Sequence, residues 1–139
     1  MATTQSYRIT IPSRTDHLFR VRNFVSELAR THGFGDDDIN KISIAVDEAC
    51  TNIIKHGYNF SPDYEIEIEV RRNGRLFEIL ISDSGKQFDP NTVETPNMKE
   101  YLTHYRRGGL GLYLMKRIMD KVEFHFSNDR NTLHMVKSL

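Results

Sequence analysis

The sequence lacks several features that would point to particular classes of protein. Its 139 residues include one cysteine, Cys50, so no intrachain disulfide can form. Cys50 lies in an apolar helical segment, which favours a small core residue over a catalytic thiol. No apolar run is long enough to span a membrane, and residues 1–10 lack the basic and apolar regions of a signal peptide. We therefore expect a cytoplasmic protein without a membrane partner.

An excess of charge of one sign is also missing. The 19 Lys and Arg residues balance 19 Asp and Glu residues, so no overall electric field attracts nucleic acid or an anionic membrane. Hydrophobic residues make up 38% and charged residues 27%, which is a normal globular composition. The chain has no internal repeat, low-complexity tract or linker. We expect a single domain over residues 1–139 and no nucleic-acid partner.

Hydrophobic periodicity predicts two helices after a short strand that ends at Pro12. Ser13 is expected to cap the first helix, which runs to about His32. The second helix opens with acidic residues at Asp36, which complement the positive end of its dipole. It closes at Gly57, for which we expect a left-handed conformation.

Alternating apolar and polar residues then predict a sheet. Its strands are expected, in hairpin pairs, at residues 64–70, 76–82, 122–126 and 132–136. A helix is expected at 110–119, and a shorter one at about 98–104. Hairpins and one-sided alternation favour a mostly antiparallel mixed sheet with helices packed on one face. The predicted fold class is α+β, a two-layer sandwich.

Glu48, Asn52 and His56 are four residues apart on the second predicted helix, so they lie along one side of it, at the border of its apolar stripe. A carboxylate there can act as a general base. An amide oxygen one turn later can join the oxygen ligands that Mg²⁺ prefers. The alternative is an ordinary polar border on an amphipathic helix, and the spacing alone favours that alternative.

Asp83 and Gly85 follow an apolar strand directly. A carboxylate at a strand end can accept a hydrogen bond from the amino group of adenine, and Gly85 allows the backbone to turn close to the base. A simple turn that terminates the strand explains the same residues, because Asp and Gly are common in turns.

A glycine-rich turn at 108–111 follows Arg107 and runs directly into a helix. Glycines allow backbone N–H groups to converge on phosphate oxygens, and a helix N-terminus favours an anion. Arg107 can reach a terminal phosphate. The turn does not fit the dinucleotide-binding fingerprint, because Leu114 stands where glycine or alanine is needed. A flexible hinge before a core helix is the alternative.

The other histidines show no paired metal-ligand spacing, so a zinc site has little support from the sequence. These are His17, His32, His104, His125 and His134. No serine or cysteine lies in a recognisable nucleophile motif.

In this order, the three motifs resemble the ATP-binding fold shared by histidine kinases, gyrase B, Hsp90 and MutL. Within that superfamily, residues 44–58, 83–89 and 108–120 resemble the bacterial anti-sigma-factor serine/threonine kinases, and the likeness covers nearly the whole chain. The resemblance implies ATP and Mg²⁺ as cofactors and a small homodimer. Its substrate would be a serine of an anti-anti-sigma-type protein, and it would also hold a sigma factor or another regulatory target inactive.

The resemblance also implies roles for particular residues. Glu48 matches the general base, and Arg107 matches an arginine near the terminal phosphate. Asn52 matches the Mg²⁺ ligand, and Asp83 matches the adenine-binding aspartate. The other candidates for nucleotide binding are Lys55, His56, Gly85, Gly108, Gly109, Leu110, Gly111, Leu112 and Thr132. In one departure from the family pattern, Gln87 replaces the usual second glycine after the aspartate.

Two other functions remain open from the sequence. The chain can be an ATP-bound anti-sigma or partner-binding module with little or no kinase activity. It can also be the ATP-binding half of a phosphorelay kinase, although it shows no helix pair carrying an acceptor histidine.

Overall fold

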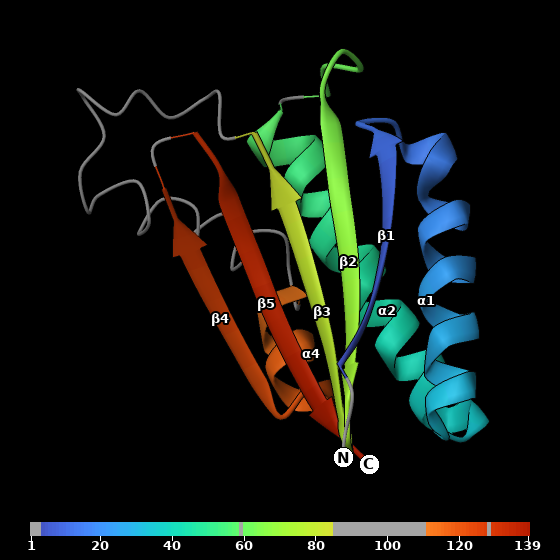
Figure 1. Cartoon of the computed structure of the whole chain (residues 1–139). Helices are drawn as coiled ribbons and strands as arrows, with labels where there is room; N and C mark the ends of the chain where they lie inside the picture. The colour runs from blue at the N-terminus through green and yellow to red at the C-terminus, as the bar shows by residue number, and fades with distance from the viewer. Residues whose placement is uncertain (1–3, 59, 85–110, 128) are drawn as a thin grey trace.

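The computed structural model describes residues 4–58, 60–84, 111–127 and 129–139, without the side chains of residues 56, 111 and 112. Five strands form one sheet in the order β1-β2-β3-β5-β4, and each neighbouring pair is antiparallel (Figure 1). The strands are β1 (Gln5–Pro12), β2 (Glu65–Asn73), β3 (Leu76–Asp83), β4 (Lys121–Phe126) and β5 (Asn131–Ser138). The predicted hairpins are confirmed, and among the described residues the sheet is antiparallel throughout rather than mixed.

The helices pack on one face of this sheet, which confirms the predicted two-layer α+β architecture (Figure 1). They are α1 (Leu18–His32), α2 (Asp36–Asn52) and α4 (Gly111–Ile118), with a 3₁₀ turn η1 (Thr15–His17) before α1 and a π-helix η2 (Ile53–Gly57) after α2. No helix in the described ranges is long and apolar enough to cross a membrane.

Ser13 does not cap α1, contrary to the prediction. Its hydroxyl donates to the carbonyl of Ser61 and accepts from the amide of Tyr64 at 3.2 Å. A 3₁₀ turn separates Ser13 from α1, whose N-cap His17 makes no side-chain capping bond. Ser13 therefore joins the end of β1 to the loop before β2. The expected end of α1 is confirmed, because Gly33 has a left-handed φ of 113°.

The second helical segment ends at Gly57 as predicted, but its last turns are not α-helical and Gly57 is not left-handed. From Ile53 the backbone adopts π-helical turns, and the amide of Tyr58 bonds to the carbonyl of Ile53 at 2.8 Å. Gly57 lies inside this π-helix, and Phe60 beyond it has the positive φ, 64°. The regular four-residue spacing assumed for His56 therefore stops at Asn52.

The side of the sheet that meets the helices, here called the covered face, is apolar. Nine of its apolar strand residues are at most 2% exposed: Ile11, Ile66, Ile68, Val70, Phe77, Ile79, Ile81, Leu133 and Met135. They alternate along each strand with residues on the opposite side. The alternation predicted for β2 is confirmed. The apolar residues of the covered face form a continuous core with the helices.

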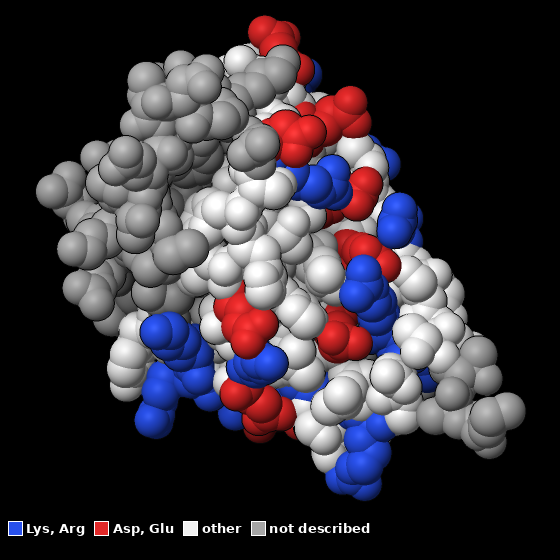
Figure 2. Space-filling model, turned by 60° about the vertical axis from the view of Figure 1, so that its left-hand side comes forward, with Lys and Arg blue, Asp and Glu red and all other residues white. Residues whose placement is uncertain are grey.

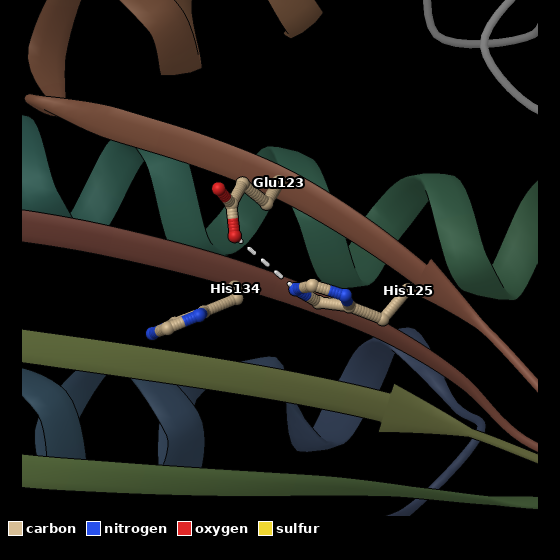
Figure 3. Close-up of side chains that lie close together, drawn as sticks. All are labelled: Glu123, His125 and His134. Carbon is tan, nitrogen blue, oxygen red and sulfur yellow. Dashed lines mark ion pairs between the residues drawn. The ribbon is translucent and has the colours of Figure 1, made fainter.

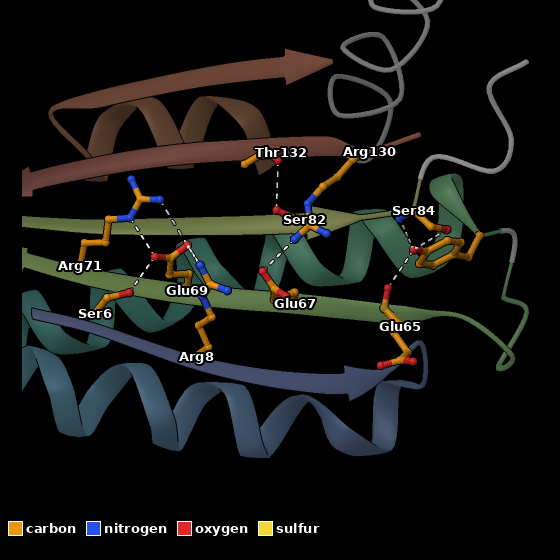
Figure 4. A network of polar contacts seen from close by, with 11 residues as sticks. Ser6, Arg8, Glu65, Glu67, Glu69, Arg71, Ser82, Ser84, Arg130 and Thr132 are labelled. Atoms are coloured by element: carbon orange, nitrogen blue, oxygen red, sulfur yellow. Dashed lines mark hydrogen bonds and ion pairs between the residues drawn. The ribbon is translucent and has the colours of Figure 1, made fainter. Parts of the chain in front are cut away.

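The opposite side of the sheet, here called the open face, is polar (Figure 4). Glu67, Glu69 and Arg71 of β2 lie on it, beside side chains from β1, β3 and β5. The view in Figure 2 shows basic and acidic side chains interspersed, without a large patch of one sign among the coloured residues. Glu69 is an exception to the expected solvation of this face, because it is only 7% exposed.

Candidate nucleotide-binding site

Asp83 is the last residue of β3, the central strand, and lies on the covered face. It is 3% exposed and faces Asn131 across the β3–β5 pair, where the Nδ2 of Asn131 donates to Asp83 Oδ1 at 3.0 Å. A buried carboxylate is costly unless hydrogen bonds compensate for the lost water. Asp83 lies at the end of a strand, on the face of the sheet that meets the helices. A carboxylate in this position can accept a hydrogen bond from the amino group of a bound base.

Asn52 is the last residue of α2 and is 6% exposed. Its Nδ2 donates to the backbone carbonyl of Glu48 at 2.9 Å. This bond uses the NH₂ group of the amide, so the amide oxygen is the atom that Asn52 can offer to a cation. Glu48 itself is partly buried, one turn earlier. An amide oxygen is a hard ligand of the kind that Mg²⁺ prefers, and a carboxylate one turn earlier can act as a general base.

Tyr58 connects these two parts of the site, and the sequence analysis did not identify it. Its hydroxyl donates to the carbonyl of Glu65 at 2.8 Å and accepts from the backbone N–H of Ser84 at 2.7 Å. Burial raises the pKa of Tyr58, so the hydroxyl keeps its proton and remains a donor. The ring stacks on Tyr64 with 4.6 Å between centroids. Tyr58 thus holds the end of η2 against the residue that follows Asp83.

The structure does not place Thr132 beside Asp83. Thr132 pairs with Ser82, and their hydroxyl oxygens are 3.0 Å apart on the open face (Figure 4). Successive strand residues point to opposite faces, so a difference of one position moves a side chain across the sheet. The β5 residue that reaches Asp83 is Asn131. That Thr132 supports an adenine site stays a prediction, and its hydroxyl contacts Ser82 on the open face.

The other residues predicted to bind the nucleotide are only partly covered by the described ranges. Five candidates lie outside them: Gly85, Arg107, Gly108, Gly109 and Leu110. The short helix expected at 98–104 lies outside them as well. Gly111 and Leu112 begin α4, so the predicted helix after the glycine-rich turn is confirmed. Lys55 is exposed on η2, and His56 is described only by its backbone, in the same π-helix.

The described site therefore combines a buried strand-end carboxylate, a buried amide at a helix end and a partly buried carboxylate one turn before it. A family model described as the histidine kinase-like ATPase domain matches residues 11–137. The chain belongs to the histidine kinase-like ATPase domain family.

Within that family, the chain is similar to bacterial proteins named serine-protein kinase RsbW. It is 34% identical to the Bacillus velezensis protein, over all of this chain and 89% of that one. It is 32% identical to the Halalkalibacterium halodurans protein, over 86% of this chain and 75% of that one. A solved Mycobacterium tuberculosis structure of RsbU and RsbW domains matches 97% of this chain with a TM-score of 0.70. This chain covers 32% of that longer one at 17% identity, so this likeness supports the fold alone.

Proposed function

We propose that this chain is an ATP-dependent protein serine/threonine kinase of a partner-switching system. It transfers phosphate to a serine of an anti-anti-sigma-type protein and sequesters a sigma factor or another regulatory target. The observation that carries this proposal is the 34% identity, over the whole chain, to a protein named serine-protein kinase. The fold alone would not distinguish a protein kinase from other ATPases that share it.

The site residues have distinct roles in this proposal. Asp83, held by Asn131, accepts a hydrogen bond from the adenine amino group. Glu48 accepts the proton of the incoming serine hydroxyl, and its place beside Asn52 puts that base near the cation ligand. Mg²⁺ on Asn52 would neutralise charge on the phosphate oxygens.

The glycine-rich turn at 108–111 supplies backbone donors to the phosphates, and Arg107 balances charge at the terminal phosphate. Phosphoryl transfer depends mainly on positioning and electrostatic stabilisation, so the site requires no protein nucleophile. By the same resemblance we infer a homodimer, and light scattering of the purified chain tests that oligomeric state. We also propose a cytoplasmic location, as the first residues of the sequence led us to expect.

The proposal is tested by incubating the protein with Mg-ATP and candidate partner proteins, followed by intact-mass measurement. We expect one phosphate on a partner serine. Glu48→Gln should slow this transfer by about 10²–10⁴-fold, because a general base is lost. Its ATP affinity should stay near that of the wild type.

The matched control is Glu27→Gln, which changes an exposed carboxylate on α1. It should leave both the transfer rate and ATP binding unchanged. If Glu48→Gln transfers phosphate at the wild-type rate, the base is another group. A wild-type protein that binds ATP and its partner without any gain of mass would instead be a nucleotide-loaded binding module.

A further inference from the structure

A second cluster of chemically active side chains lies on the open face, where β4 meets β5 (Figure 3). Glu123, His125 and His134 each offer one ligand atom, and these atoms lie within 4.8 Å of one another. No residue of this cluster belongs to the proposed nucleotide site. Its function therefore needs a separate explanation.

The sheet creates this cluster from residues whose sequence spacing does not suggest one. Glu123 and His125 are two residues apart on β4, so their side chains point to the same face. His134 faces Glu123 directly across the β4–β5 pair. Side chains opposite each other on antiparallel strands are close neighbours. Three potential ligands therefore converge on one point above two strands.

The distances suit a small metal ion. With bonds of about 2.0–2.2 Å, a tetrahedral zinc ion holds its ligand atoms roughly 3.3–3.6 Å apart. The Nε2 of His125 is already 3.3 Å from Oε2 of Glu123. The two imidazole rings have centroids 6.2 Å apart, and the side chain of His125 is 59% exposed. Because the His125 side chain is exposed, a modest rotation of it can bring His125 within coordination distance of an ion that Glu123 and His134 also bind.

His134 also has the partner that orients a metal-binding histidine. Its Nε2 lies 2.9 Å from Oε1 of Glu78, on the neighbouring strand β3. A carboxylate that accepts the proton on one ring nitrogen leaves the other nitrogen as the ligand and increases its basicity. Glu78 would hold His134 with Nδ1 available to the ion.

Glu123 carries the negative charge that such a site requires. Its Oε1 forms an ion pair with Nζ of Lys121 at a distance of 3.0 Å, as an ionised carboxylate does. Because Lys121 contacts Oε1, the other oxygen, Oε2, is directed toward His125.

From this geometry we propose that Glu123, His125 and His134 bind a divalent transition-metal ion of the zinc type. Two imidazoles and one carboxylate favour such an ion over Mg²⁺ or Ca²⁺, which prefer oxygen ligands alone. Glu78 positions His134 from the second coordination shell. Three protein ligands on an exposed face leave a fourth position for water or for a group of another molecule.

The test is a calorimetric titration of the whole, nucleotide-free protein with a zinc salt. Excess Mg²⁺ is present throughout, so that sites made of oxygen ligands are already occupied. We expect one zinc ion per chain with micromolar or tighter affinity. Glu78→Gln should weaken binding by about 10–100-fold, and His125→Ala and His134→Ala should weaken it further. His17→Ala, which removes a histidine outside the cluster, should bind like the wild type.

The proposal is overturned if the wild type does not bind zinc in this range. It is also overturned if the His125→Ala/His134→Ala double variant binds zinc with wild-type affinity and stoichiometry. Circular dichroism and ATP binding of each variant show that the chain is folded. Failure of the kinase test would leave this result unaffected, because the two sites share no residue.

Discussion

The two faces of the sheet use the same strands in opposite ways. On β3, Ile79 and Ile81 are fully buried under the helices, and Leu80 between them lies on the open face. The covered face carries a buried charge at its edge, at Asp83, where we propose that a nucleotide binds. The open face carries charges along its length, and Glu69 and other charged residues there are paired with one another (Figure 4).

The two faces therefore contribute differently to the stability of the fold. Packing on the covered face supplies most of the stabilisation, because burial of apolar surface is the dominant favourable contribution to folding. Ion pairs that remain exposed add little, since solvent screens them. A polar group on the covered face therefore indicates function more strongly than a polar group on the open face does.

The largest effect that would test this comparison is on stability. Ile79→Ala should lower the free energy of unfolding by about 2–5 kcal/mol, because it leaves a cavity in the core. Leu80→Ala, the matched change on the open face, should cost only about 1 kcal/mol, since the leucine is already partly exposed. Urea unfolding measures both. Equal losses would show that the two faces contribute alike.

The next effect concerns ATP. Asp83→Asn should weaken ATP binding by about 10–100-fold, which corresponds to a charge-assisted hydrogen bond of about 1.5–3 kcal/mol. Calorimetry with ATP and Mg²⁺ measures this change. The control is Asp37→Asn, which changes an exposed carboxylate in the first turn of α2, at the other end of that helix from Asn52. This variant should bind ATP like the wild type. Unchanged affinity in Asp83→Asn would remove Asp83 from the adenine site.

A smaller effect is expected at Glu69 on the open face. Hydrogen bonds from Arg71 at 2.8 Å and Ser6 at 2.7 Å hold its carboxylate, and Arg71 is the main cause of its lowered pKa. Glu69→Gln should lower stability at neutral pH by about 1–3 kcal/mol. Arg130→Ala, which breaks the exposed pair with Glu67, should cost about 0–1 kcal/mol.

The pH dependence of the Glu69 effect has a definite sign. The pKa of Glu69 is lower in the folded than in the unfolded state, so its charge stabilises the fold fully above the unfolded value of about 4.3. That contribution disappears as the pH falls through the folded pKa. The difference between wild type and Glu69→Gln should therefore shrink in acid, as measured by urea unfolding at several pH values. A difference that is constant with pH would contradict this account.

Much of the fold could be predicted from local patterns in the chain. The alternation of Ile66, Ile68 and Val70 with glutamates correctly identified the covered face of β2. The hairpin between β2 and β3 was predicted as well, and Gly74 in its turn has a φ of 61°. Local prediction failed where a side chain bonds to a distant segment instead, as with Ser13, whose hydroxyl bonds to residues about fifty positions away rather than to the helix beside it.

The candidate site divides in the same way. Asp83 and Asn52 were candidates from their positions in the sequence, the resemblance implied their roles, and the structure places both at buried ends of their elements. Tyr58 and Asn131 were missed, because their roles depend on contacts between segments far apart in the chain. In the sequence, only the position of Tyr58 within segment 44–58, which resembles the kinases, indicated that it belongs to the site.

The sequence by itself determined the order of the three motifs and, among the described residues, the strands, their hairpins and the positions of the three α-helices. These features depend on periodicity and turn chemistry over a few residues. Only the tertiary structure decided that Asn131, not Thr132, meets Asp83, and that His134 meets Glu123. The physical reason is strand register, because a shift of one residue between paired strands turns each side chain to the other face of the sheet.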